Sequence, residues 1–357
     1  MISISLCMIV RDEEDVIERC LKSVVGVYDE LIIVDTGSTD KTKEISQKYT
    51  DNIYDFEWIN DFSKARNFSF EKATKDYILW LDADEFLNEE CREKLIFLKS
   101  SICTDIDIIS LQTYMCLDEN NNPRVVGRRN RIVKREKNLK WTGFVHEYIE
   151  VEGTLHDTSI YIIHDKVKCC EGRNLNIYKM NIEKGNKLSS RDLYYYGKEL
   201  YCNKLWEESI EILNIFVEEH TSRDEIIDAL CKIGECYQQL NELVKGRDYF
   251  YKTFEYGEPR CEVLYNIAKS FANQKNHTSA IAWYEIILGL NIKSDSRQCT
   301  NLSCLRFKPH LNLCVCYYEI GDIQKSYYHH LKAKEINPLN LSVLKNDKFF
   351  ENLQNQN

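Results

Sequence analysis

Three carboxylates lie close together in the segment Asp82-Ala83-Asp84-Glu85. They follow directly on an apolar run at residues 77–81, which is typical of a strand buried on both faces of a parallel sheet. Such a strand delivers Asp82 to the carboxyl end of the sheet, where open α/β folds bind their ligands. Carboxylates at positions i and i+2 repel each other unless a cation lies between them, and these oxygen ligands suit Mg²⁺ or Mn²⁺. The segment therefore indicates a metal site, although an Asp-x-Asp pair alone is more often an ordinary polar exit from a strand.

Further polar side chains fall at the ends of other expected elements. Asp35 follows the apolar run at residues 31–34, where a carboxylate can accept a hydrogen bond from the ribose or base of a nucleotide. Arg66 lies near the start of an expected helix, where a guanidinium would suit a diphosphate or a uracil edge, or would simply be exposed. His164 ends another apolar strand, and its imidazole is a reasonable further ligand for Mn²⁺ beside a carboxylate.

Glu147 and His146 are the candidates for a general base. They end the stretch 141–147, and either could take a proton from an acceptor that lay within hydrogen-bonding distance. In isolation, such a pair is more often structural. The first strand is not followed by Gly-x-Gly-x-x-Gly, which disfavours NAD or FAD as a cofactor.

The elements that position these residues alternate along the first hundred residues. We expect strands at 2–10, 31–34, 53–58 and 77–81, and helices at 16–24, 39–49, 62–73 and 88–98. This alternation predicts right-handed crossovers and a mostly parallel sheet. Further strands, expected at 107–116, 131–135, 144–150 and 158–164 with a turn at 118–123, should extend the sheet in partly antiparallel fashion and wall the site.

The remainder of the chain is helical and repetitive. Small residues early on four expected helices are each followed by an aromatic residue three or four positions later: Gly197, Gly234, Ala268 and Cys314. They recur 37, 34 and 46 residues apart, and a second amphipathic helix follows, for example at 206–218 and 279–290. The tetratricopeptide (TPR) period is about 34 residues, so we interpret this part as TPR-like, with an irregular helical bundle as the alternative. The predicted organisation is an α/β domain at 1–170, a linker or first helix at 171–190, all-α repeats at 191–340 and a tail at 341–357.

Composition narrows the class of protein. The net charge of -10 argues against nucleic acid as a partner, although the basic cluster at 124–140 could face an anionic ligand if it is not a solvated loop. We find no signal peptide and no apolar window of the ~18 residues that a membrane span requires. Fifteen cysteines without a secretory signal predict the reducing cytoplasm and mostly free thiols.

Four segments in register resemble family 2 glycosyltransferases of the GT-A fold: Leu-Cys-Met-Ile-Val-Arg-Asp-Glu-Glu at 6–14, Val-Asp-Thr-Gly-Ser-Thr-Asp at 34–40, Ser-Lys-Ala-Arg-Asn at 63–67 and Leu-Asp-Ala-Asp-Glu at 81–85. The continuation, Gly-Phe-Val-His-Glu at 143–147 and then His164, is similar to a bacterial subgroup with C-terminal TPRs. That subgroup includes S-glycosyltransferases that modify cysteines of bacteriocin peptides.

The resemblance implies inverting transfer from a nucleoside-diphosphate sugar, usually a UDP-sugar. Carried over by position, Asp35 would bind the base, Arg66 the nucleotide, Asp82 the ribose or the metal, and Asp84 the Mg²⁺ or Mn²⁺ ion. The nucleotide pocket would be framed by Ile9, Val10, Arg11 and Glu13. The Glu-Asp pair that supplies the base in many family members is missing from the expected window, so Glu147 is our first candidate and His146 the second.

We therefore predict a metal-dependent inverting glycosyltransferase whose repeats hold a peptide or protein acceptor and could also mediate homo-oligomerisation. Two alternatives stay open: a glycosyltransferase acting on a surface polysaccharide or lipid-linked glycan, and a non-catalytic scaffold that binds a sugar nucleotide. The sequence leaves open the donor sugar, the acceptor atom (sulfur or oxygen) and the identity of the metal.

Overall fold

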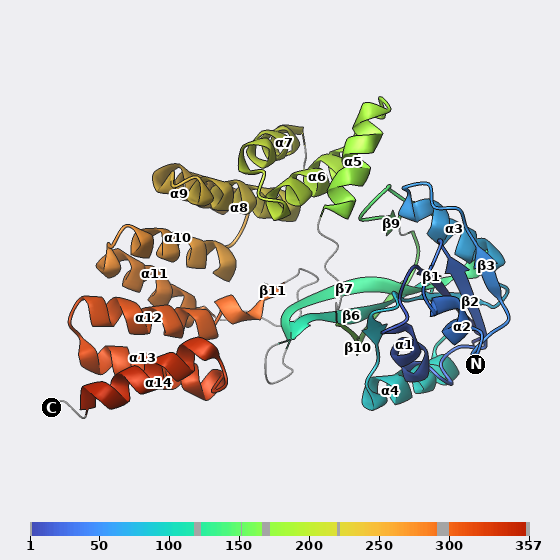
Figure 1. Ribbon diagram of the computed structural model, residues 1–357, viewed down its shortest axis with the longest axis horizontal. Coiled ribbons are helices and arrows are strands. Elements are labelled where there is room, and N and C mark those ends of the chain that lie inside the picture. The colour runs from blue at the N-terminus through green and yellow to red at the C-terminus, as the bar shows by residue number, and fades with distance from the viewer. Residues whose placement is uncertain are drawn as a thin grey trace. The chain divides into compact units, whose positions relative to one another are not determined.

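The computed structural model describes residues 2–117, 123–150, 152–165, 172–219, 222–290 and 300–354. The turn expected at 118–123 thus lies, except for Pro123, outside the described residues. The chain folds into two compact units (Figure 1), which are described separately. The first comprises Met1–Cys116 and Val126–Lys184, and the second comprises Leu117–Val125 and Gly185–Asn357.

The first unit alternates strands and helices and then continues mainly as strands. Its elements in chain order are β1 (Ile4–Val10), α1 (Ile17–Ser23), β2 (Glu30–Asp35), α2 (Thr42–Ser46), β3 (Ile53–Asp55), α3 (Phe62–Lys72), β4 (Tyr77–Trp80), β5 (Glu85–Phe86), α4 (Glu89–Ser101), β6 (Ile108–Leu117), β7 (Pro123–Lys134), the 3₁₀ turn η1 (Arg135–Lys137), β8 (Trp141–Thr142), β9 (Tyr148–Ile149), β10 (Leu155–His164) and α5 (Arg173–Glu183).

The main sheet has the strand order β3-β2-β1-β4-β7-β6-β10-β5. Strands β3, β2, β1 and β4 run parallel, as do β6 and β10, whereas β7 is antiparallel to β4 and β5 is antiparallel to β10. The predicted mixed, mostly parallel sheet is therefore confirmed. In β4, Tyr77 and Leu79 pack in the core cluster of α1 and α4, while Ile78 and Trp80 pack in the cluster of α3, so this strand is buried on both faces as expected.

Two predicted strands are too long: the one expected at 53–58 ends at Asp55, and most of the one expected at 144–150 is not a strand. Of residues 144–150, only Tyr148–Ile149 form a strand, β9, which pairs with β8 in a separate two-stranded sheet. Residues 143–147 form a tight loop, since Gly143 and His146 have φ angles of 102° and 52°, which a strand cannot contain. The apolar pattern there reflects burial of Val145 and not a strand.

The second unit consists mainly of helices. Its elements are α6 (Ser190–Cys202), α7 (Trp206–Glu219), α8 (Arg223–Gln239), α9 (Leu243–Lys252), the 3₁₀ turn η2 (Thr253–Glu255), α10 (Cys261–Asn273), α11 (His277–Gly289), β11 (Thr300–Asn301), the 3₁₀ turn η3 (Leu302–Cys304), α12 (Phe307–Glu319), α13 (Ile323–Ile336) and α14 (Leu341–Gln354). The residues expected as a C-terminal tail thus include a helix. None of the described helices is long and apolar enough to cross a lipid bilayer.

The small residues of the repeat pattern lie where paired helices come closest. A Cβ atom at Gly197 of α6 would lie 2.5 Å from Cδ2 of Leu213 on α7, and one at Gly234 of α8 would overlap the ring of Phe250 on α9. At the equivalent positions, Ala268 of α10 is 0% exposed and Cys314 of α12 is 4% exposed. The predicted helical hairpins are confirmed, and their spacing is set by these short side chains.

Two histidines face each other between α12 and α13. The Nδ1 atoms of His310 and His329 lie 2.9 Å apart, and the His329 ring stacks on Tyr317 with centroids 5.4 Å apart. Burial, together with the nearby charges of His329, Arg306 and Lys332, lowers the pKa of His310 to about 4. Burial also lowers the pKa of His329. The pair is therefore neutral at pH 7 and is joined by a single proton.

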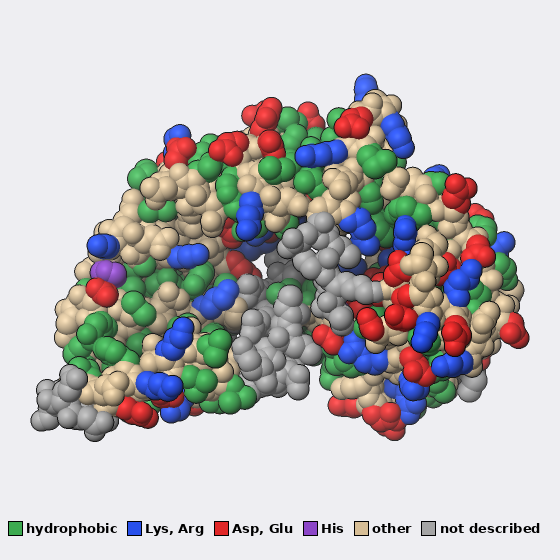
Figure 2. All heavy atoms as spheres, viewed as in Figure 1, with side chains coloured by type: hydrophobic (Ala, Val, Ile, Leu, Met, Phe, Trp, Pro, Cys, Tyr) green, Lys and Arg blue, Asp and Glu red, His purple; other side chains and the backbone are tan. Residues whose placement is uncertain are grey.

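The last helices expose much apolar surface. Figure 2 shows hydrophobic side chains, in green, over the part of the second unit where Figure 1 draws α12 to α14. The exposed large apolar residues on these three helices are Val315, Tyr318, Ile323, Tyr328, Leu331, Ile336, Leu341, Leu344 and Phe349. The described surface of these three helices is therefore apolar in part, with charged side chains between the apolar ones.

Replacing Gly234 by valine should destabilise the second unit by about 1–3 kcal/mol, because the added atoms overpack against Phe250. Chemical denaturation followed by circular dichroism measures the change in free energy of unfolding. Gly289→Val is the matched control, since no atom of the described residues lies within 4 Å of a Cβ there. Equal stability of the two variants would show that close helix packing at Gly234 is not limiting.

Acidification should destabilise the protein through His310. In the unfolded chain this residue takes up a proton near its ordinary pKa of 6.5, but in the folded chain only near 4, so the unfolded state binds more protons between these values. The contribution of neutral His310 to the free energy of unfolding is thus fully present above pH 6.5 and is lost as the pH falls toward 4. Since the ring is partly exposed, we expect about 1–2 kcal/mol between pH 7.5 and pH 5.

Thermal unfolding at the two pH values measures this loss. His310→Gln should show a smaller drop in stability than wild type, while His156→Gln, which alters an exposed ring in the first unit, should keep the wild-type pH dependence. Identical pH profiles for His310→Gln and wild type would contradict the assignment.

Candidate active site

A cavity of about 340 Å³ lies at the carboxyl ends of β1 and β4, the place where open α/β sheets bind ligands. All of its lining residues belong to the first unit. They are Ile9, Val10, Arg11, Glu13, Thr36, Trp58, Phe62, Arg66, Trp80, Asp82, Ala83, Asp84, Arg129, Trp141, Val145, His146, Glu147, His164, Arg173 and Asn174.

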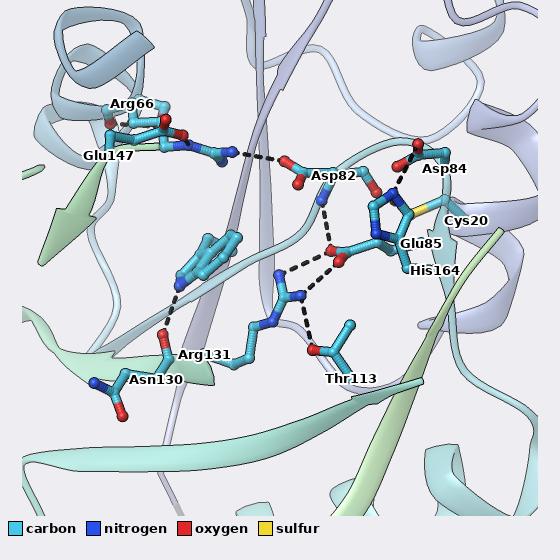
Figure 3. Close-up of polar contacts among 12 residues, drawn as sticks. Cys20, Arg66, Asp82, Asp84, Glu85, Thr113, Asn130, Arg131, Glu147 and His164 are labelled. Carbon is cyan, nitrogen blue, oxygen red and sulfur yellow. Dashed lines mark hydrogen bonds and ion pairs between the residues drawn. The ribbon is translucent and has the colours of Figure 1, made fainter. Parts of the chain in front are cut away.

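Arg66 lies at the centre of the polar contacts. Helix α3 begins after Asp61, whose side chain accepts a hydrogen bond from the backbone N–H of Lys64, and this places Arg66 in the second turn. The Nη2 atom of Arg66 lies 2.7 Å from Oδ1 of Asp82, and Nε lies 2.5 Å from Oε1 of Glu147 (Figure 3). The side chains of Arg66 and Glu147 are 8% and 11% exposed, so their ion pair is largely shielded from water, whereas Asp82 is 31% exposed at the cavity.

Two tryptophans hold this guanidinium in place. The Arg66 guanidinium carbon lies 4.9 Å from a ring centroid of Trp80 and 4.9 Å from one of Trp141, within the range of cation–π attraction. Burial alone would raise the pKa of Asp82, but the guanidinium of Arg66, with Arg131 and Arg129 further away, lowers it below its ordinary value. Asp82 is thus ionised, and one of its oxygens is already occupied.

A buried ion pair fixes the turn that carries the two aspartates. Oε2 of Glu85 accepts a hydrogen bond of 3.0 Å from the backbone N–H of Asp82, and the Glu85 N–H donates back to the Asp82 carbonyl at 3.1 Å. Arg131 donates to both carboxylate oxygens of Glu85, at 2.8 and 2.5 Å. Arg131 and Glu85 are 0% and 1% exposed, and Arg131 stacks 3.9 Å from the Trp80 ring centroid. The Arg131–Glu85 ion pair, together with the hydrogen bonds between Glu85 and Asp82, therefore fixes the turn; we call these contacts the clamp.

Asp84 and His164 meet on the other side of this turn. Nε2 of His164, the last residue of β10, lies 3.1 Å from Oδ2 of Asp84. This hydrogen bond, against the effect of burial, raises the pKa of His164 above its ordinary value. Within the described residues, no group of three or more His, Cys, Asp or Glu side chains is placed to hold a metal ion. Mg²⁺ and Mn²⁺ commonly take one or two protein carboxylates and complete their shell with phosphate and water, so Asp84, 24% exposed at the cavity, fits such a site.

The expected base-binding carboxylate lies deeper. Asp35 is 1% exposed, and its Oδ1 accepts hydrogen bonds from the N–H groups of Gly37 and Ser38, both at 2.9 Å. Its Oδ2 is buried and has no hydrogen-bond partner among the described residues. Thr36, the next residue, lines the cavity where Asp35 does not. The four residues expected to frame the nucleotide, Ile9, Val10, Arg11 and Glu13, all line the cavity.

The two base candidates occupy the loop at 143–147. The loop is anchored to α3, since the N–H of Phe62 donates to the carbonyl of Phe144 at 2.9 Å and Asn67 makes two hydrogen bonds to the backbone of Trp141. Glu147 is 11% exposed and reaches Arg66, whereas His146 has the left-handed φ of 52°. Both border the cavity.

Sequence reasoning missed Trp80, Trp141, Arg129 and Arg131 as site residues. The last two were visible only as members of the basic cluster at 124–140, and no local signal separates them from their exposed neighbours. The two tryptophans could have been found from their type, since a large ring at the end of a buried strand often shapes a ligand pocket.

The first unit is similar to known proteins. Residues 5–151 match the family model described as glycosyl transferase family 2. The SPbeta prophage-derived glycosyltransferase SunS of Bacillus subtilis is 26% identical over 280 residues, which are 72% of this chain and 64% of SunS. These matches confirm the resemblance to family 2 glycosyltransferases.

Other matches are more partial. A TPR repeat-containing protein of Synechococcus elongatus is 51% identical over 87 residues, which are 24% of this chain and 22% of that protein. The chain thus spans less than two thirds of the length of these first curated relatives. Among solved structures, pilF of Pseudomonas aeruginosa is 14% identical and covers 50% of this chain and 80% of its own, with a TM-score of 0.36.

Glu85→Gln should lower the free energy of unfolding by about 3–5 kcal/mol, because it leaves the buried Arg131 without its counter-charge. Chemical denaturation of the full chain measures this loss. The control Glu136→Gln breaks the exposed pair with Lys134 and should leave the free energy of unfolding close to that of wild type. A double variant with Arg131→Met should be less destabilised than the sum of the single changes, and strict additivity would refute the clamp.

Proposed function

We propose that the protein is an inverting glycosyltransferase that moves a sugar from a UDP-sugar to a peptide or protein acceptor bound by its helical repeats. The observation that carries the proposal is the pair of contacts made by Arg66, in a part of the chain that matches glycosyl transferase family 2. Its guanidinium binds Asp82, which we assign to the donor side of the cavity, and Glu147, which we assign to the acceptor side. In-line displacement needs a general base on the acceptor side, which Glu147 could supply, and positive charge beside the leaving diphosphate on the donor side, where a metal ion held by the aspartates would supply it.

On the donor side, the nucleotide lies against the residues that follow β1 and β2. Oδ2 of Asp35, which has no hydrogen-bond partner among the described residues, is the oxygen assigned to a donor group of the base, next to Thr36 at the cavity wall. Asp84, with Asp82 and His164 beside it, would hold the Mg²⁺ or Mn²⁺ ion, which when bound supplies positive charge to the leaving diphosphate.

On the acceptor side, Glu147 takes the acceptor proton. Arg66 bonds Oε1 of Glu147, so Oε2 is the oxygen assigned to the proton transfer. Arg66 also prevents Glu147 from turning away, because Nε and Nη2 of a planar guanidinium fix the angle between its two partners. His146, the neighbouring residue in the loop, is the second candidate for the base.

The peptide acceptor rests on the second unit. Stacked helical hairpins offer an extended surface whose usual task is binding a peptide or protein. SunS, which matches 72% of this chain, is named a glycosyltransferase. A polysaccharide or lipid-linked acceptor and a non-catalytic scaffold are the outcomes that the experiment below separates.

The test uses the full chain, a panel of UDP-sugars and added Mg²⁺ or Mn²⁺. We expect donor hydrolysis and metal-linked UDP binding, and a loss of turnover of about 100-fold or more in Asp84→Ala, as removal of a group that stabilises developing charge commonly causes. Glu89→Ala, which removes an exposed carboxylate of α4, is the control and should match wild type.

Three results distinguish the proposed function from its two alternatives. If Asp84→Ala equals wild type in both nucleotide affinity and turnover, the metal assignment is wrong. Absence of any nucleotide binding by wild type would favour the scaffold. Mass spectrometry of peptides containing Cys, Ser or Thr after incubation with the accepted donor tests the acceptor, and modification of glycans alone would reject the peptide.

A further inference from the structure

The basic cluster at 124–140 divides according to what its members contact. Most described members have partners on the protein: Arg128 with the carbonyl of Thr158, Arg131 with Glu85, Lys134 with Glu136, Arg135 with the carbonyl of Lys75, Lys137 with Asp107 and Lys140 with Glu71. Arg129 differs from them. It lines the cavity, and among the residues that the structure describes, its guanidinium has no hydrogen bond or ion pair.

The register of the sheet explains why Arg129 reaches the cavity. In the antiparallel pair of β4 and β7, Tyr77 is opposite Lys134 and Leu79 is opposite Ile132. Continued by one residue to the end of β4, this register places Trp80 opposite Arg131, and Arg129 lies two residues further along β7, past the end of β4. Residues directly opposite in an antiparallel pair point to the same face. The stacking of Arg131 on Trp80 at 3.9 Å fits this register.

Two arginines of β7 therefore follow the same face of the sheet, but at different depths. Arg131 is buried and neutralised by Glu85, so its charge is committed to the protein. Arg129 is exposed and lies one pleat closer to the carboxyl end of β4, beside the Asp82 turn. Arg129 interacts with the Asp82 carboxylate only at longer range, since no hydrogen bond or ion pair between them is found among the described residues, so its guanidinium is available for an anionic ligand.

We infer that Arg129 binds the diphosphate of the donor and stabilises its charge as it leaves. In the transfer, the acceptor heteroatom bonds to the anomeric carbon of the sugar while the bond from that carbon to the diphosphate oxygen breaks. The electron pair of the broken bond stays on the diphosphate, and the acceptor proton passes to the base. A guanidinium beside the diphosphate stabilises this product charge more than the charge of the intact donor. The inference rests on the proposed function.

The test measures binding of UDP, UMP and uridine to the full chain by calorimetry. Arg129→Ala should weaken UDP binding about 10- to 100-fold, the usual loss of a charge-assisted hydrogen-bonded contact, and leave uridine binding unchanged. Lys134→Ala removes the same charge from the other end of the same strand, outside the cavity, and should bind all three ligands as wild type does. Arg129→Lys should restore part of the UDP affinity, since it keeps the charge and loses the planar fork.

Turnover gives an independent measure. Arg129→Ala should lower kcat for the accepted donor more than it raises KM, because the contact is strongest when the diphosphate leaves. Equal weakening of UDP and uridine, or behaviour indistinguishable from Lys134→Ala, overturns the role of Arg129 while wild-type UDP binding still supports the proposed function. Failure of wild type to bind UDP overturns both.

Discussion

The contact of Arg66 with two carboxylates is the interaction on which the cavity depends. Asp82 and Glu147 are 65 positions apart in the chain, and each lies on a different connection of the first unit. A single guanidinium, 8% exposed and flanked by the rings of Trp80 and Trp141, brings them to opposite sides of one charge. Removing that charge would leave two carboxylates facing each other in a shielded place. Buried ion pairs contribute little net stability compared with apolar packing. The main effect of the Arg66 contacts is therefore to fix the positions of the two carboxylates.

Arg131 helps to fix the residues that Arg66 contacts. Arg131 contacts Trp80 from the side of β7, while Arg66 contacts it from α3, so one indole ring lies between two cations of different role. Glu85 neutralises Arg131 and at the same time receives the N–H of Asp82, which fixes the backbone of the aspartate turn. Because other side chains hold the residues that face the cavity, the site needs little rearrangement when its ligand binds.

The sequence predicted those features that depend on local periodicity. The buried run at 77–81, the alternation of the first strands and helices, and the short residues Gly197 and Gly234 at helix crossings could all be found from spacing. Contacts set by strand pairing could not. Whether Arg129 or Arg131 faces inward, and at what depth, depends on the register of β7 against β4, which is fixed by residues far away in the chain. The loop at 143–147 resembled a strand because Val145 is buried, and positive φ angles leave no trace in an apolar pattern.

The placement of the tryptophans has an optical consequence. Of the five tryptophans in the chain, Trp58, Trp80 and Trp141 line the cavity, whereas Trp206 and Trp283 belong to α7 and α11. Trp80 and Trp141 lie edge to face with centroids 4.9 Å apart, in the field of the Arg66 charge. Indole emission depends on nearby charges and on water, so three of the five tryptophans are placed to change their emission when a ligand enters this cavity. The protein thus carries its own unlabelled reporter of whatever enters the site.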